Sequence, residues 1–329
     1  MKKITTLLTA IIGMAFMNQV SATHVTVEVP TAGQLSSLVQ NANCDSITIS
    51  GNLDGNDFWF IREQMPNLIY LSIGKVTVPD NKLPESGLYS KKALQKIILP
   101  DNLGTIGNHA FAYCSNLKDI TFPKSLVTIE YNAFYQSGLT EATLPDKLKN
   151  IGDAAFYECY NLKKVNFPEK LVSIGNSAFR QCNLSEIAFP DSLKAIGSNA
   201  FRYCQQLQKV TFPEKLETIG THAFNDCFRL HTATLKGKTA PVISDNTFNY
   251  TKVFYVPEGA AQTYKEAPNW SNLVIIDGNT PKKITVTLTT AGTLGEEILK
   301  QVDYVKQVNE LVINGPLNSD DFYQIQQQT

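Results

Sequence analysis

The middle of the chain repeats one pattern of apolar and polar positions six times. The copies open at Leu94, Leu117, Leu139, Leu162, Leu184 and Leu207. Successive starts are 22 or 23 residues apart, and a degraded seventh copy begins at Leu230. A fixed period of this length is typical of stacked repeats, in which no unit buries its apolar face alone. The pattern therefore predicts a solenoid over residues 94–252.

Each copy predicts the same short elements. In the second copy, Ile120 and Phe122 alternate with polar residues, as in a short strand with one buried face. Pro123 lacks an amide hydrogen and is expected to end that strand. Ala133 and Phe134 are expected on a short helical or 3₁₀ segment, with the large phenylalanine filling the wide side of the coil.

A turn follows the second apolar stretch of most units, and it carries a glycine. We expect this glycine to adopt a positive φ, which glycine tolerates without steric cost. The residues concerned are Gly107, Gly152, Gly175, Gly197 and Gly220. In the second copy Glu130 stands in its place, which puts the turn of that unit in doubt.

The recurring pattern LxxIxFPxxLxxIGxxAFxxC resembles the BspA-like class of bacterial leucine-rich repeats, over about half of the chain. The resemblance implies an α/β repeat solenoid, a right-handed leucine-rich-repeat coil with a parallel strand face. It also implies a secreted or surface-exposed protein with a role in adhesion to host proteins or other cells.

Both ends of the array are expected to be capped, because an open solenoid end exposes core and strand edges. Residues 23–93 are interpreted as an N-terminal cap module that leads into the repeats. Residues 253–278 combine a strand, a turn, a short helix and a second apolar strand, which is the composition expected of a C-terminal cap.

A weaker repeat links the two ends of the chain. The segments 24–39 and 47–58 recur as 283–299 and 311–322. Residues 279–329 are therefore interpreted as a second, incomplete copy of the N-terminal cap module. One hypothesis is that the natural protein, or its ancestor, continued into another array, or that this chain is a fragment.

The first residues have the pattern of a secretory signal. Lys2 and Lys3 precede an apolar run over 4–16, and small residues up to Ala22 form a cleavage site. We expect cleavage of residues 1–22 after Ala22. The run is too short to span a bilayer, so the sequence predicts a secreted or cell-surface protein without membrane insertion.

Charge and motifs narrow the function classes. The formal net charge is -1 and the pI is near 6.4, which gives no reason to expect nucleic acid as a partner. Two of the four histidines lie at turn positions before the Ala-Phe pair, most polar residues occupy repeated positions, and the sequence contains no recognisable catalytic or nucleotide-binding motif. We therefore predict no enzyme, no catalytic residues, no metal site and no cofactor.

Five of the six cysteines occupy one position of the repeat. They are Cys114, Cys159, Cys182, Cys204 and Cys227. Equivalent side chains on stacked units point the same way, which is poor geometry for a disulfide. We expect buried free thiols that act as small hydrophobes.

Two acidic turns, at 54–57 and 318–321, superficially resemble cation-binding loops. They lack the continued ligand spacing of a calcium hand. Aspartate and asparagine are favoured in turns and as helix caps, so we interpret both segments as helix starts.

The outward positions of the predicted strands are the main candidates for ligand binding. One column comprises Lys96, Asp119, Glu141, Lys164, Glu186 and Lys209, and its neighbour includes Thr121, Thr143, Asn166 and Thr211. Charges of mixed sign on adjacent strands also stabilise a sheet and keep it soluble, which is the alternative explanation.

A second candidate surface follows the repeat phenylalanine in consecutive units. It comprises Tyr135, Tyr157, Arg180 and Arg202. Tyrosine and arginine are enriched at interaction hot spots, although such a column could also be merely exposed.

These observations favour an adhesin-type binding protein that recognises a protein or glycan ligand, which could come from a host, through the repeat surface. The alternative is a structural spacer or scaffold module of a larger cell-surface protein. An enzyme is the third and least favoured class.

Overall fold

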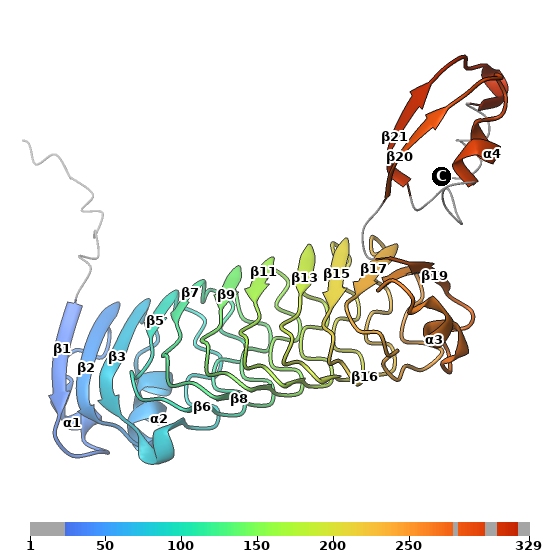
Figure 1. The fold of residues 1–329 in the computed structure, drawn as a ribbon. Helices are drawn as coiled ribbons and strands as arrows, with labels where there is room; N and C mark the ends of the chain where they lie inside the picture. The colour runs from blue at the N-terminus through green and yellow to red at the C-terminus, as the bar shows by residue number, and fades with distance from the viewer. Residues whose placement is uncertain (1–23, 279–281, 300–307, 322–329) are drawn as a thin grey trace, which may run out of the picture.

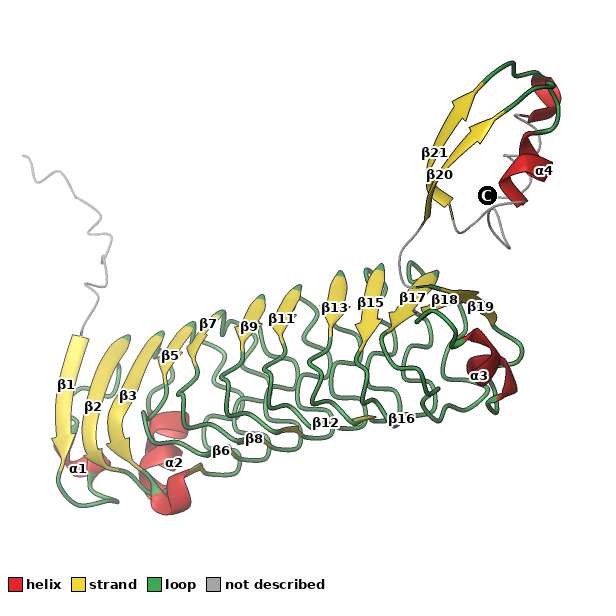
Figure 2. Ribbon diagram, viewed as in Figure 1, coloured by secondary structure: helices red, strands yellow, loops and turns green. Residues whose placement is uncertain are grey.

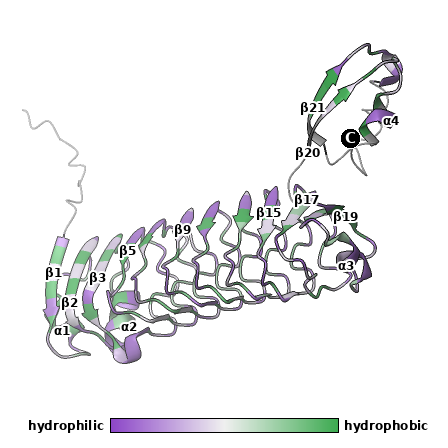
Figure 3. Cartoon of the chain, in the orientation of Figure 1, coloured by the Kyte–Doolittle hydropathy of each residue, from purple (hydrophilic) through white to green (hydrophobic). Residues whose placement is uncertain are grey.

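The computed structural model describes residues 24–278, 282–299 and 308–321 (Figure 1). The expected signal peptide and its cleavage after Ala22 lie outside these residues. Over 24–278 the chain is a solenoid of parallel strands, as the repeat pattern predicts. Hydrophobic and hydrophilic stretches alternate along the whole coil (Figure 3).

Within the described residues, twelve strands form one face of the solenoid, one strand for each turn (Figures 1 and 2). They are β1 (His24–Val29), β2 (Ser46–Asn52), β3 (Tyr70–Thr77), β5 (Lys96–Ile98), β7 (Asp119–Thr121), β9 (Glu141–Thr143), β11 (Lys164–Asn166), β13 (Glu186–Ala188), β15 (Lys209–Phe212), β17 (Thr232–Leu235), β18 (Val253–Val256) and β19 (Val274–Asp277). We call this surface the strand face.

A second face consists of strands of two residues each, which pair in parallel from unit to unit. They are β4 (Lys82–Leu83), β6 (Thr105–Ile106), β8 (Thr128–Ile129), β10 (Asn150–Ile151), β12 (Ser173–Ile174), β14 (Ala195–Ile196) and β16 (Thr218–Ile219). Leu83 of β4 and the isoleucine of each of the other strands are buried, which holds the coil closed on this side.

The third side carries the Ala-Phe pairs, and we call it the turn face. The expected helical or 3₁₀ segment there is wrong, because two residues of each unit have a positive φ, such as 55° at His109 and 62° at Tyr113. Alternate amides instead donate to the next unit, with Phe111 N 2.7 Å from the Ala133 oxygen. The helices of the solenoid therefore lie only in its end regions.

The expectation of a positive φ at the repeat glycines is also wrong. The positive φ falls two residues later, at positions such as His109 and Asn199. The glycine is needed for close packing of neighbouring coils: a Cβ at Gly197 would lie 2.5 Å from the Asn176 nitrogen. Glu130 keeps the turn, since its amide still donates to the Ile106 oxygen at 3.0 Å.

The core is a continuous stack of the repeat side chains. Phe134 and Phe156 lie 5.0 Å apart with nearly parallel rings, and the same stacking recurs along the array. All six cysteines are buried and free, which confirms that prediction. The repeat cysteines also donate hydrogen bonds, as from Cys159 Sγ to the Phe134 oxygen at 3.0 Å.

The first turns contain α1 (Leu35–Leu38), α2 (Gly55–Gln64) and the 3₁₀ helix η1 (Pro79–Asn81). Asp54 caps α2 by accepting hydrogen bonds from the amides of Asn56 and Asp57, which confirms the interpretation of this acidic turn. Asp57 is buried and accepts from the Gly33 and Leu35 amides, so it joins α2 to the loop before α1.

The last turns contain α3 (Ala261–Glu266), which is followed by the buried Trp270. The Trp270 indole donates to the Pro241 oxygen at 2.9 Å, and the Tyr264 hydroxyl donates to the Gly237 oxygen at 2.8 Å. These aromatic side chains cover the end of the phenylalanine stack.

A small unit follows, made of β20 (Lys282–Thr287), α4 (Leu294–Leu299) and β21 (Val308–Asn314), with a hydrophobic cluster of its own. Asp321 accepts from the amides of Gly292 and Leu294, as Asp57 does in the first turns. The two weakly similar sequences thus build the same local structure. None of the helices in the described residues is long and apolar enough to cross a membrane.

Candidate functional site

The strand face is interrupted at two places. In the described residues the strand ladder runs from β1 to β7, then pairs β9 with β11, and resumes from β13 to β19. No strand pairing joins β7 to β9 or β11 to β13.

Each interruption follows a unit of 22 residues. In the 23-residue units two residues separate the cysteine from the next leucine, as between Cys114 and Leu117. Only one residue separates Ser137 from Leu139, or Cys182 from Leu184. The shortened connections therefore coincide with the breaks in the ladder, and the 22-residue spacing in the sequence was the signal that marked them.

The breaks expose part of the core. Val165 on β11 and Phe167 directly after it, before the second break, are only partly buried. Ile187 on β13 and Phe189 directly after it are each 3% exposed. Phe122, before the first break, is likewise only partly buried. Sequence analysis placed these side chains in the core and missed their exposure.

A hollow of about 510 Å³ lies at the second break, and we call it the strand-face hollow. It is lined by Lys164, Val165, Asn166, Phe167, Glu186, Ile187, Ala188, Lys209 and Thr211. The floor is apolar and the rim is charged. Five of the predicted binding residues thus lie together around it.

The charged side chains of the rim differ from those at the start of the column. Lys96 and Asp119 form an ion pair at 2.7 Å, so they neutralise each other. Among the described residues, Lys164, Glu186 and Lys209 form no ion pair within 4.0 Å. Their charges are therefore available to a ligand.

Asn166 has a structural role in addition to its place on the rim. Its side-chain oxygen accepts from the Leu144 amide at 2.7 Å, and its nitrogen donates to the Leu144 oxygen at 3.2 Å. The remaining predicted residues of the strand face, Thr121, Glu141 and Thr143, are exposed on the strands beside the first break.

The turn face brings the second predicted set together. Tyr135 and Tyr157 belong to a row of tyrosines on this face. The centroids of their two rings are 5.3 Å apart. The guanidinium of Arg180 lies 5.2 Å from the Tyr157 ring centroid and 5.5 Å from that of Tyr203. These are cation–π distances. Sequence analysis missed Tyr203 because it does not occupy the Tyr135 position of the repeat.

Glu158 is the acidic centre of this tyrosine row. Burial alone would raise its pKa, but hydrogen bonds from Gln136, Tyr160, Tyr157 and Tyr135 hold the pKa below its ordinary value of 4.5. Burial, together with the same carboxylate, raises the pKa of Tyr160 to about 12. The carboxylate is therefore engaged within the molecule.

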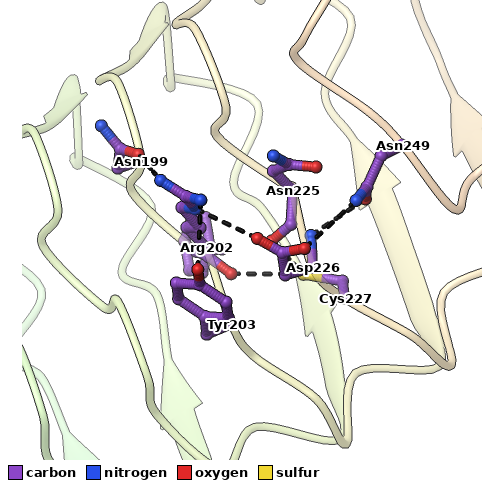
Figure 4. Close-up of polar contacts among 8 residues, drawn as sticks. Asn199, Arg202, Tyr203, Asn225, Asp226, Cys227 and Asn249 are labelled. Atoms are coloured by element: carbon purple, nitrogen blue, oxygen red, sulfur yellow. Dashed lines mark hydrogen bonds and ion pairs between the residues drawn. The ribbon is translucent and has the colours of Figure 1, made fainter.

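The two predicted arginines have different surroundings. Arg202 donates from Nε to Asp226 at 3.1 Å and from Nη2 to the Tyr203 hydroxyl at 3.1 Å (Figure 4). The Arg180 side chain forms no hydrogen bond or ion pair with the described residues, and its Nε is buried. Arg202 is thus neutralised locally, whereas Arg180 is not.

The described residues show no group of three or more histidine, cysteine or acidic side chains able to hold a metal ion. Burial raises the pKa of Cys114 and of Cys159 to about 12, so these thiols are protonated at neutral pH and are poor nucleophiles.

The sequence profile of the family described as "BspA type Leucine rich repeat region" matches residues 81–192 and 172–273, in six copies. Together these matches span more than half of the chain. No curated protein sequence matches significantly.

Several solved structures are similar. A leucine-rich repeat protein of T. pallidum is 27% identical, with 50% of this chain and 79% of that chain covered and a TM-score of 0.48. A leucine-rich cell surface protein of Faecalibacterium prausnitzii is 18% identical, with 92% and 90% covered and a TM-score of 0.47. The pneumococcal vaccine antigen PcpA is 18% identical, with 73% and 80% covered and a TM-score of 0.37.

Proposed function

The chain belongs to the BspA-type leucine-rich-repeat family, and on that premise we propose that it is a secreted or cell-surface binding protein of the adhesin type. It recognises a protein or glycan ligand through the repeat surface, and the strand-face hollow is the principal contact. The signal-like pattern of residues 1–22 supports the location.

One observation carries the proposal: an apolar floor is exposed on a rigid sheet, and unpaired charges surround it. Val165 and Phe167 are partly exposed at the floor. Lys164 and Lys209 stand on either side of Glu186 on the rim. A partner can bury an apolar side chain on the floor and place complementary charges against the rim, the arrangement found at interaction hot spots.

The strand ladder supports the mechanism, because binding to a pre-formed sheet costs little conformational entropy. The strands on both sides of the hollow are paired into the sheet, through β9–β11 and β13–β15. The opposite charges on the rim favour a partner of mixed charge over a purely acidic or basic one.

The test is a binding screen of the full chain against immobilised extracellular matrix proteins and a glycan array, followed by substitution. Lys164→Ala with Lys209→Ala should weaken binding of a recovered partner by roughly tenfold or more, since each lysine offers one charge-assisted contact. Lys96→Ala is the matched control, because this lysine lies in the same column and is paired with Asp119. Equal affinity of the double variant and the control for the partner would exclude the strand-face hollow as the binding site. Asn166 is left unchanged because of its contact with Leu144.

A spacer role is the second candidate, and the repeated cap module favours it. The contacts of Asp321 with Gly292 and Leu294 reproduce those of Asp57 with Gly33 and Leu35. A module that occurs twice is suited to joining arrays in series. This role predicts that the full chain binds nothing in the screen.

A further inference from the structure

A second hollow, of about 410 Å³, opens on the turn face at the shortened connection from Cys182 to Leu184. It is lined by Tyr160, Gln181, Cys182, Asn183, Tyr203, Gln205 and Gln206. We call it the turn-face notch. The units on either side carry the additional residue that the 162–183 unit lacks, so their connections stand above the notch as its walls.

The lining of the notch is polar but uncharged. The side-chain amides of Gln181, Asn183 and Gln205 offer both donors and acceptors, and none of them forms a hydrogen bond with the described residues. Tyr160 as a residue is 54% exposed, so its ring is open to a ligand even though its hydroxyl group donates to Glu158. Amides that can bind hydroxyl groups, beside an open aromatic ring that can cover an apolar ring face, complement a sugar.

Arg180 supplies a positive charge next to the notch. It precedes Gln181 in the chain, and its guanidinium lies over the ring of Tyr203, which also lines the notch. Tyr157 on its other side fixes the guanidinium in place. Unlike Arg202, it has no carboxylate partner among the described residues. A fixed guanidinium without a counter-ion suits a carboxylate, which it can bind through two parallel hydrogen bonds.

We propose that the turn-face notch binds a carboxylated glycan, with a sugar ring against Tyr160, its hydroxyl groups on the amides, and its carboxylate on Arg180. An acidic peptide fits less well, because the lining offers amides and phenols in place of a pocket for apolar side chains. This site is separate from the strand-face hollow, so it does not depend on the function proposed for that surface.

Calorimetric titration of the full chain tests the proposal with four probes. The probes are 3′-sialyllactose, a hyaluronan tetrasaccharide, lactose and hexaglutamate. At least one of the two carboxylated sugars should bind roughly tenfold more tightly than lactose, since one charge-assisted hydrogen-bonded pair contributes about that factor. The two sugars distinguish a sialic acid from a uronic acid as the source of the carboxylate.

Variants assign the contact. Arg180→Gln should remove the preference for the carboxylated sugar over lactose, and Arg180→Lys should keep part of it. Gln205→Ala should weaken the binding of the carboxylated sugar and of lactose to the same degree, because it removes a contact with a sugar hydroxyl group. Lys170→Ala, at an exposed residue of the same unit that lines neither hollow, is the control and should leave sugar binding unchanged.

Three results would overturn the proposal. They are equal binding of lactose and both carboxylated sugars, full affinity of the Arg180→Gln variant, and tighter binding of hexaglutamate than of either sugar. A melting temperature equal to that of the unchanged chain shows that each variant is folded. Loss of partner binding in the Lys164 and Lys209 variant, with sugar binding intact, would separate the two surfaces.

Discussion

At the scale of single residues, the solenoid depends on side chains that meet their equivalents in the next unit. The phenylalanine rings stack at about 5 Å, and each such pair contributes roughly 0.5–1.5 kcal/mol beyond its burial. The cysteine thiols satisfy carbonyl oxygens of the preceding unit, as Cys204 Sγ does with the Phe179 oxygen. Because these contacts repeat, a change at one residue affects two interfaces.

Gly197 should be intolerant of any side chain, although Glu130 occupies the equivalent position of the second copy. In Gly197→Ala, the new Cβ would lie 2.5 Å from the backbone nitrogen of Asn176, so the neighbouring coil must shift. We expect the free energy of unfolding to fall by about 1–3 kcal/mol in urea titrations. Gly104→Ala is the control, because its nearest neighbour would be the Asn81 oxygen at 3.7 Å. Equal losses in the two variants would contradict the packing explanation.

Glu158 should make the stability of the tyrosine row dependent on pH. Its pKa is lowered in the folded chain, so its contribution to stability is complete above 4.5 and is lost as the pH falls through the lowered pKa. Glu158→Gln should therefore reduce the melting temperature at about pH 7, and the difference from the unchanged chain should shrink at about pH 3. A difference that is the same at both pH values would show that the charge is unimportant.

At the scale of elements, the length of one connection decides whether two strands pair. The connection from Cys182 to Leu184 is one residue short, and the strands β11 and β13 on either side of it do not pair with each other. The strand-face hollow and the turn-face notch both lie along this unit. Both candidate sites therefore lie along the unit that is one residue short.

Insertion of one serine between Cys182 and Asn183 should close the break. The new connection would have the Cys-Ser-Asn-Leu sequence found at 114–117, where the strands pair. We expect β11 and β13 to join, with slower amide hydrogen exchange at Val165 and Ile187 and loss of ligand binding at both sites. A serine inserted after Cys204, in a connection of full length, is the control and should not slow exchange. Unchanged exchange at Val165 would show that connection length does not cause the break.

At the scale of the whole molecule, the described chain has two separate hydrophobic clusters. One runs through the solenoid from Val27 to Ile275, and the other consists of Val286, Leu288, Leu294 and Ile298 with its neighbours. Among the described residues, no side chain belongs to both clusters. The two should therefore unfold independently.

Deletion of residues 279–329 should leave the melting temperature of the solenoid unchanged to within about 2 °C. Trp270→Ala should lower the free energy of unfolding by about 3–5 kcal/mol, because it leaves a cavity at the end of the core. Calorimetry of the full chain, the deletion and the substitution measures both effects. A large loss of stability on deletion would show that the C-terminal unit supports the solenoid.

The sequence by itself determined the period, the inward positions, the free thiols and the helix start in the acidic turn at 54–57. These follow from local alternation and from the stacking of identical units, which the spacing alone specifies. It also supplied candidate residues on the strand face and on the turn face, because the outward positions of a repeat are set by the same alternation.

Only the tertiary structure decided how neighbouring coils meet. It showed that the turn at Phe111 is not a helix, that Gly197 serves close packing, and that Lys96 is neutralised while Lys164 is not. The physical reason is that these properties arise between residues about one unit apart in sequence, where the relative path of two coils sets the distances. The hollow between β11 and β13 is such a property, because a unit that is one residue short leaves a hollow only where the units stacked beside it are longer.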